Sequence, residues 1–236
     1  MRVAIYFTPA RNHPLTEAAS RWLGWDMHKG TAAEQAPVAG LGVDEVRRLT
    51  VTPRRYGFHA TLKPPFRIAE PCTVRHVETA LGMFCRDREP LTLGRLRIVP
   101  IDGFFAIVPT APRLEVDTLA ADAVRYFDRF RAPATPSEIA ERQPAQLSER
   151  QRTHLRLWGY PYVFGDFRFH MTLTGPVAAD RREAVGNALR RHLAAALRTP
   201  LMLDAVSVVV EPHPTAPFAL KASSALMAVA QAMVVA

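Results

Sequence analysis

The chain has 236 residues, of which 48% are hydrophobic, which is enough to build the core of one large domain or of two packed lobes. It carries 30 Lys and Arg residues against 22 Asp and Glu, a formal net charge of +8, and only three of the basic residues are lysines. Arginine suits phosphate-bearing partners, but a basic surface without such a partner explains the charge equally well.

The cysteine content and the two ends of the chain favour the cytoplasm. Cys72 and Cys85 show no metal or redox spacing, and the sequence starts with a strand-like segment rather than a secretion leader. The apolar segment SALMAVAQAMVVA is interrupted by Gln231 and is too short to span a membrane, so we expect a terminal helix there. We expect a monomer that does not bind a membrane.

The first predicted elements precede any candidate site. RVAIYF is expected to be a strand, and HPLTEAASRWLG a helix that Gly24 ends. The segment from Lys29 to Gly42 is rich in Gly, Ala and Pro and is predicted to be a loop, and VDEVRRLT a short helix.

An internal repeat follows. FHATLKPPF, residues 58–66, and FHMTLTGPV, residues 169–177, share five of nine positions. The first copy continues into a predicted helix TVRHVETALGMFCRDR and a hairpin of LTLGRLRIVP and FFAIVP that turns at Asp102-Gly103. The second copy continues in the same order with ADRREAVGNALRRHLAAALR, LMLDAVSVVV and FALKAS. The repeats cover about residues 55–108 and 166–222.

The two repeats are joined by a segment that neither repeat contains. Helices are expected at PRLEVDTLAADAVRYFDRFR and SERQRTHLRLWG, within residues 112–158, with a Pro-rich loop RAPATPSEIAERQPAQ between them. Ser148 and Gln151 have capping-box spacing, and Gly159 is placed to end the second helix. We expect this connection to cover the site or to shape its specificity.

These elements predict an α+β fold. We expect one duplicated, two-lobed domain over residues 1–236, in which each lobe has an antiparallel sheet with helices on its outer face, around a pseudo-twofold cleft. The structure of the tail, residues 223–236, is left open, and the last strand is in doubt because FALK runs into SSALMAVAQ.

Strand alternation divides each copy into an apolar and a polar face. Tyr56, Phe58, Ala60 and Leu62 share the apolar face of the first copy, and Phe167, Phe169, Met171 and Leu173 that of the second. The opposite faces carry the sets Arg55, His59, Thr61 and Lys63, and Arg168, His170 and Thr172. One His-x-Thr could simply be the wet side of a sheet, but two in matching repeats favour a shared site.

Such a pair suits phosphoryl chemistry. One neutral imidazole can activate water while an imidazolium opposite protonates a leaving oxygen. The hydroxyls of Thr61 and Thr172 can donate to phosphoryl oxygens, and Lys63, Arg55 and Arg168 could neutralise charge. Tyr6, on the first strand, could stack on a substrate ring, although a core role fits it as well.

Three other kinds of site are less well supported. Zinc usually takes three or four ligands, and here the histidines bring threonines rather than Asp, Glu or Cys partners. No Gly-x-Ser-x-Gly nucleophile motif is present, and no G-x-G-x-x-G or P-loop pattern for nucleotides occurs. We therefore expect neither a metal nor a cofactor.

With these motifs the chain resembles the two-histidine (2H) phosphoesterase superfamily, which includes RNA cyclic phosphodiesterases and enzymes called RNA ligase-like. RVAIYFTP, RYGFHATLKPPF, LWGYPYVF and FRFHMTLTG are similar to a branch described as phosphonate-metabolism proteins. The resemblance covers roughly residues 1–212. It implies that His59 and His170 are catalytic and that Thr61 and Thr172 bind the phosphoryl group.

The function expected from the sequence is a metal-independent cyclic phosphodiesterase, a hydrolase acting on a small phosphorylated sugar or nucleotide, in phosphonate metabolism. One alternative is an enzyme that acts on RNA ends with a 2′,3′-cyclic phosphate. A second is a module that binds a phosphorylated ligand without turnover. The sequence does not say which histidine is the base.

Overall fold

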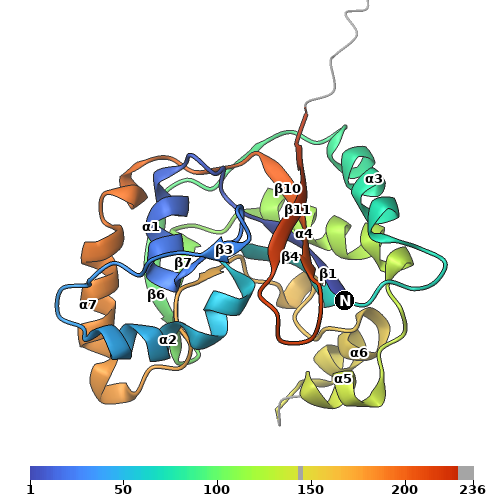
Figure 1. The fold of residues 1–236 in the computed structure, drawn as a ribbon. Coiled ribbons are helices and arrows are strands. Elements are labelled where there is room, and N and C mark those ends of the chain that lie inside the picture. Colours follow the sequence, from blue (N-terminus) through green and yellow to red (C-terminus); the bar gives the residue numbers. More distant parts are fainter. Residues whose placement is uncertain (143–145, 228–236) are drawn as a thin grey trace, which may run out of the picture.

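The fold is α+β, as the sequence predicts, and is built on one antiparallel sheet. The computed structural model describes residues 1–142 and 146–227. Within them seven strands form the main sheet, in the order β11-β10-β1-β4-β8-β7-β6 (Figure 1). The strands are β1 (Arg2–Phe7), β4 (Ala60–Phe66), β6 (Leu96–Ile101), β7 (Phe104–Pro109), β8 (Met171–Thr172), β10 (Ala205–Glu211) and β11 (Ala219–Ala225).

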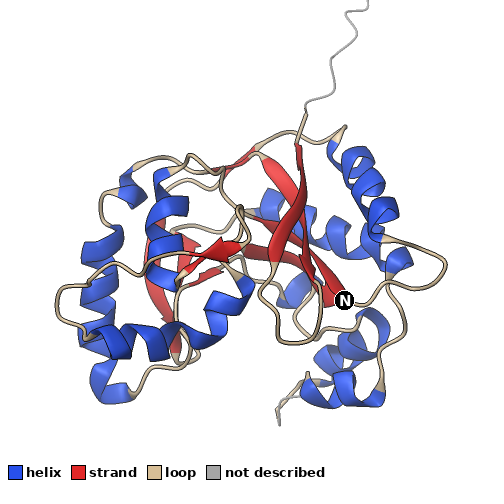
Figure 2. Ribbon diagram, in the orientation of Figure 1, coloured by secondary structure: helices blue, strands red, loops and turns tan. Residues whose placement is uncertain are grey.

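Helices cover the two ends of this sheet (Figure 2). The α-helices of the described residues are α1 (Pro14–Leu23), α2 (Val43–Tyr56), α3 (Val74–Cys85), α4 (Leu114–Phe127), α5 (Pro136–Glu141), α6 (Glu149–Trp158) and α7 (Arg182–Leu193). Helix α7 contacts β6 and α1, whereas α3 contacts β10 and β11, and α4 contacts β4. No helix in this described part of the chain is long and apolar enough to cross a membrane.

The main sheet is continuous, which differs from the expected pair of separate sheets. Ala60 of β4 pairs with Met171 of β8, so the two His-x-Thr segments join the halves. The hairpin β6–β7 of the first repeat lies beside β8 of the second, and β10 and β11 lie beyond β1 on the side of β4. A sequence repeat fixes the order of the elements but not which copy each hairpin pairs with.

Several local predictions are confirmed. Asp102 and Gly103 turn the β6–β7 hairpin with φ values of 45° and 95°. In α6 the Ser148 side chain accepts from the amide of Gln151 and the Gln151 side chain accepts from the amide of Ser148, while Gly159 ends the helix at a φ of 71°. The strand that the sequence left in doubt forms as β11 and pairs with β10.

Other boundaries were wrong. Helix α2 runs to Tyr56, so Arg55 and Tyr56 belong to a helix and not to the first His strand. The Pro-rich segment contains α5, which begins with a capping box between Thr135 and Glu138.

The second His strand and the tail also differ from expectation. Only Met171–Thr172 of FRFHMTL is strand, because the chain before it forms a 3-10 turn at Phe164–Asp166. At the other end, Ser224 and Ala225 belong to β11 and not to a terminal helix, and residues 228–236 lie outside the described part of the chain.

One apolar core spans both ends of the sheet. It includes Phe7 and Leu62 from the β1–β4 side and Ile107 and Leu173 from the β7–β8 side. Trp22 of α1 is fully buried, and its indole donates to the carbonyl of Leu173 at 2.7 Å. The backbone that carries both His-x-Thr segments is therefore held from beneath by a packed interior.

Two short ladders complete the fold. β2 (Trp25–Asp26) pairs with β3 (Thr31–Ala32), and only β3 falls inside the segment that was expected to be a loop. β5 (Leu91–Thr92) pairs with β9 (Met202–Leu203), and these two strands occupy equivalent places in the two repeats, just after α3 and α7.

Candidate functional site

The register of β4 against β8 brings the two His-x-Thr segments together. Ala60 lies opposite Met171 in an antiparallel pair. Continuing this register by one residue in each direction sets His59 opposite Thr172 and Thr61 opposite His170. Side chains opposite one another on one face of such a pair are about 5 Å apart at Cβ, and diagonal neighbours about 7–8 Å apart. The two histidines thus occupy opposite corners of a four-residue group.

His59 is held on several sides. Its Nδ1 lies 3.0 Å from the carbonyl oxygen of Gly57 and its Nε2 lies 3.1 Å from the hydroxyl of Thr61. Because a carbonyl can only accept, Nδ1 carries the hydrogen, and the lone pair of Nε2 in the neutral ring accepts from the Thr61 hydroxyl. The ring of Tyr6 stacks on it with centroids 3.7 Å apart and planes 15° apart.

His170 is oriented by an equivalent bond. Its Nδ1 donates to the carbonyl of Arg168 at 2.8 Å, which leaves Nε2 for another partner. Each histidine therefore donates from Nδ1 to the carbonyl two residues earlier. Phe104, in β7, lies beside the His170 ring at 5.9 Å between centroids.

The surroundings of His59 favour its neutral form. Removal of the ring from water lowers the pKa of His59 to about 4, the bond to Gly57 opposes this shift, and the charge of nearby His170 adds to it. At neutral pH His59 is an uncharged acceptor, which is the state that a general base requires.

A two-part cleft lies over these residues. One part, of about 480 Å³, is lined by His59, Thr61 and Thr172, and the other, of about 700 Å³, is lined by His170 and Arg168. The parts are continuous because they share Thr61, Pro64, Phe104 and Tyr160. Each volume lies in the range of ordinary small-molecule sites.

Lys63 does not reach this cleft, which corrects the expectation from strand alternation. The pairing of β1 with β4 is irregular, with Tyr6 opposite Thr61 but Ile5 opposite Lys63. This β-bulge sends Lys63 to the helix side of the sheet. There its side chain is 1% exposed, and its ammonium donates to the carbonyl of Val124 at 3.1 Å and to Asp128 at 2.9 Å.

Of the other candidate binding residues, two line the cleft and one does not. Arg168 is exposed and lines the larger part of the cleft. Tyr6 lines the smaller part, but it is buried and stacked on His59, so it supports a site residue. Arg55 lies outside both cavity linings, because it belongs to α2 and pairs with Glu211.

The connection between the repeats lines the cleft, as expected. Arg142, which follows α5, contributes to the smaller part, and Arg150 and Gln151 of α6 contribute to the larger. Tyr160 borders both parts, and Tyr162 packs against it with centroids 5.6 Å apart. Tyr160 and Tyr162 thus line the cleft as well as bracing each other.

Two cleft arginines escaped the sequence reasoning. Arg2 and Arg142 line the smaller part, yet neither lies in a repeated segment. Arg2 is the first residue of β1, and Arg142 follows the short helix α5. No regular spacing in the sequence relates either residue to the histidines. Their proximity depends on the tertiary fold alone.

The described residues bring together no group of three or more His, Cys, Asp or Glu side chains that could hold a metal ion. His154 and Asp166 are close, with Nδ1 3.4 Å from the carboxylate, but Asp166 is also paired with Arg150 at 2.9 Å. The side chains that line the cleft offer imidazole, hydroxyl, guanidinium and carboxylate groups.

Comparison with known proteins gives a family match and two curated relatives. The family described as "Protein of unknown function (DUF1045)" matches residues 61–219. A protein of Janthinobacterium sp. (strain Marseille) named "Ribose 1,5-bisphosphate phosphokinase PhnN" is 39% identical over 221 residues, 92% of this chain and 49% of that protein. One of the same name from Laribacter hongkongensis (strain HLHK9) is 33% identical over 224 residues, 93% of this chain and 50% of that protein. The chain spans about half the length of these relatives.

Proposed function

The chain belongs to the DUF1045 family of proteins of unknown function, and we propose that it is a metal-independent phosphoesterase that opens a cyclic phosphodiester by acid–base catalysis. The observation that carries this proposal is the register of β4 and β8, with Ala60 opposite Met171. It supports a site in which two imidazoles and two hydroxyls face one phosphorus atom.

In the proposed reaction His59 is the base and His170 the acid. Nε2 of neutral His59 takes a proton from water as the water oxygen bonds to phosphorus, and Nε2–H of charged His170 gives a proton to the sugar oxygen as its bond to phosphorus breaks. One water is consumed and a phosphate monoester forms. Proton exchange with solvent restores both rings.

The threonines fit the role of phosphoryl ligands. In the extended register Thr61 and Thr172 occupy the other two corners of the group, between the base and the acid. Their hydroxyls could donate to the two non-bridging oxygens, where negative charge is carried during displacement. The attacking and leaving oxygens then point toward the two histidines, which suits an in-line reaction.

We also propose that the two halves arose by duplication. The equivalent strands β5 and β9 pair with each other, and so do the equivalent strands β4 and β8. Pairing of equivalent segments is the contact expected near a pseudo-twofold axis. On this view the same symmetry explains why the β6–β7 hairpin of the first repeat lies beside β8 of the second.

A phosphorylated sugar is the substrate class that we propose first. The curated relatives are named for a ribose 1,5-bisphosphate phosphokinase, but the chain matches only half of each. The 236-residue sequence contains no P-loop pattern. We therefore assign the kinase activity of those relatives to the half that this chain does not match. This chain would act on a related sugar phosphate, with phosphonate metabolism as the proposed setting.

A screen of cyclic phosphodiesters tests the proposal. The panel should contain ribose and nucleoside cyclic phosphates and an RNA end with a 2′,3′-cyclic phosphate, each assayed with and without a chelator. We expect turnover of a small cyclic phosphate that the chelator leaves unchanged. Loss of activity with the chelator, or no ring opening of any member, would contradict the proposal. Preference for the RNA end, with a steep salt dependence, would favour the RNA alternative.

A further inference from the structure

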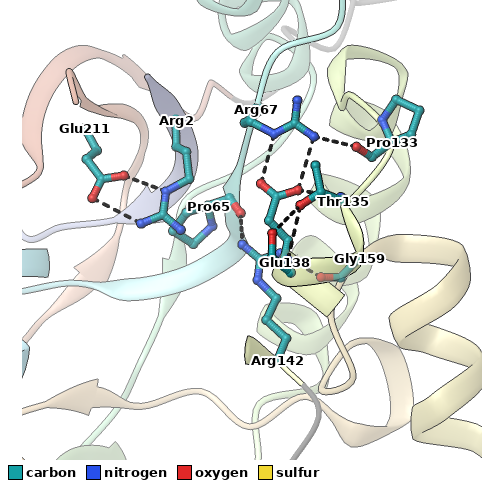
Figure 3. Close-up of polar contacts among 10 residues, drawn as sticks. Arg2, Pro65, Arg67, Pro133, Thr135, Glu138, Arg142, Gly159 and Glu211 are labelled. Atoms are coloured by element: carbon teal, nitrogen blue, oxygen red, sulfur yellow. Dashed lines mark hydrogen bonds and ion pairs between the residues drawn. The ribbon is translucent and has the colours of Figure 1, made fainter. Parts of the chain in front are cut away.

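The smaller part of the cleft contains an arginine that is held by two backbone carbonyls. Arg142 donates from its two terminal nitrogens to the carbonyls of Gly159 at 2.7 Å and Pro65 at 2.6 Å (Figure 3). Among the carboxylates whose side chains the structure describes, none forms an ion pair with it. Glu138, an acidic group close enough to act on the charge of Arg142, accepts from two nitrogens of Arg67, at 2.9 and 3.2 Å.

A second arginine enters the same cavity. Arg2 lines it together with Arg142, and the two lie on either side of Pro65 in Figure 3. Arg2 shares the buried carboxylate of Glu211 with Arg55, so two guanidinium groups meet one acid there. Burial lowers the pKa of Arg142, and the neighbouring charge of Arg2 lowers it further. This end of the cavity thus holds a surplus of positive charge.

Two tyrosines line the cavity together with the arginines. They are Tyr56 and Tyr160, and the positive charge of Arg142 is close enough to Tyr160 to oppose the rise in its pKa that burial causes. Two carbonyl bonds fix the Arg142 guanidinium, which therefore loses little freedom when it binds a ligand. Planar, fixed guanidinium groups are the usual protein ligands of phosphate.

We propose that Arg142 and Arg2 form a second phosphate subsite, which binds a phosphate monoester carried by the substrate apart from the cyclic phosphate. This inference rests on the proposed function, because it takes the His-x-Thr group as the place of the reacting phosphorus. His59, Thr61, Arg2 and Arg142 line one cavity of about 480 Å³, a size that suits one small molecule reaching from the catalytic residues to the arginines. The substrate would then be a sugar with two phosphates, one of them cyclic.

Matched substrates test the subsite. kcat/KM should be measured for two ribose cyclic phosphates that differ only in a monoester phosphate on O5. We expect the wild type to prefer the phosphorylated member by about 10- to 100-fold, since each charge-assisted bond to phosphate is strong. The substitutions Arg142→Gln and Arg2→Gln should reduce this preference by a similar factor. Arg47→Gln, on an exposed stretch of α2 outside both cavity linings, is the control and should leave the preference unchanged.

The outcomes separate the subsite from the catalytic proposal. Equal kcat/KM for the two substrates in the wild type would overturn the subsite while the catalytic proposal stands. A dinucleotide cyclic phosphate carries an internal phosphodiester in place of the O5 monoester. If it has a higher kcat/KM than the ribose cyclic phosphate with the O5 monoester, the proposed subsite is overturned in favour of binding an RNA end.

If neither ribose substrate reacts, a binding measurement still tests the subsite. Calorimetry with ribose 5-phosphate and ribose should then show tighter binding of the phosphate, weakened about 10-fold or more by Arg142→Gln and retained in Arg47→Gln. Equal binding of the two sugars would contradict the subsite. The folded state of each variant can be checked by its thermal unfolding, so that a misfolded variant is not taken for a loss of binding.

Discussion

The two His-x-Thr motifs share a sequence pattern but differ in their surroundings. His59 is stacked on Tyr6, bonded at both ring nitrogens and half-buried in the lining of the smaller part of the cleft. The described contacts of His170 are the Nδ1 bond to Arg168 and the neighbouring ring of Phe104, in the larger part of the cleft. The repeat predicts that the two rings come together, whereas the neighbours of each ring differ, and we propose that this difference suits His59 to act as the base and His170 as the acid.

The largest effect is expected from removing either ring. His59→Ala and His170→Ala should each lower kcat by at least about 10²-fold, because each proton transfer contributes 10² to 10⁴. Steady-state rates on the best cyclic phosphate check this. His213→Ala, an exposed histidine outside both cavity linings, should retain full activity. Activity that survives in both site variants would exclude the proposed chemistry.

The hydroxyls should matter next. Thr61→Val and Thr172→Val remove a donor to the phosphoryl oxygens with little change in shape, and kcat should fall by about 10- to 100-fold. Thr61 also bonds to Nε2 of His59 at 3.1 Å, so its loss should in addition raise the pH at which activity begins. Equal rates for wild type and both variants would count against phosphoryl binding by these residues.

Tyr6 sharpens the contrast between the two motifs. Tyr6→Leu removes the stacked ring and lets water reach His59, so the pKa of His59 should rise toward the ordinary histidine value. We expect a kcat loss of about 10-fold from the looser ring. Tyr6→Phe keeps the stacking and serves as the matched control. Equal effects of Tyr6→Leu and Tyr6→Phe on kcat and on the pKa of His59 would show that stacking by Tyr6 does not keep His59 neutral.

The smallest effect on activity is expected at Lys63. Burial lowers the pKa of Lys63 to about 8, although its bond to Asp128 opposes this. Lys63→Met should leave kcat unchanged, and urea unfolding should show a stability within about 1 kcal/mol of the wild type or higher, because Asp128 keeps Arg131 as its partner. A large loss of activity would contradict the placement of Lys63 outside the cleft.

The same substitution has a pH signature. Between about pH 8 and 10.5 the unfolded chain binds more protons at Lys63 than the folded one, so this residue makes the free energy of unfolding rise with pH. Over that range the free energy of unfolding of the wild type should rise relative to that of Lys63→Met. A difference that does not vary with pH would contradict the lowered pKa.

Residues that obey a regular pattern could be predicted from the sequence. The histidines, the threonines, the Asp102-Gly103 turn and the α6 caps are fixed by short-range spacing, and each lies where its pattern indicates. Lys63 was misplaced because a bulge reversed strand alternation, and Arg55 because α2 continues through Pro53. Arg2 and Arg142 were missed because only the folded chain brings them together.

The pH dependence of kcat/KM tests the central claim most directly. With His59 as base and His170 as acid, the rate on a cyclic phosphate should fall on both sides of an optimum. Its acid side should lie near pH 4, where His59 becomes charged. In His59→Ala the acid side should disappear from the residual rate, and in His170→Ala the alkaline side. A wild-type profile that is flat from pH 4 to 9, or one that neither substitution alters, would contradict the account.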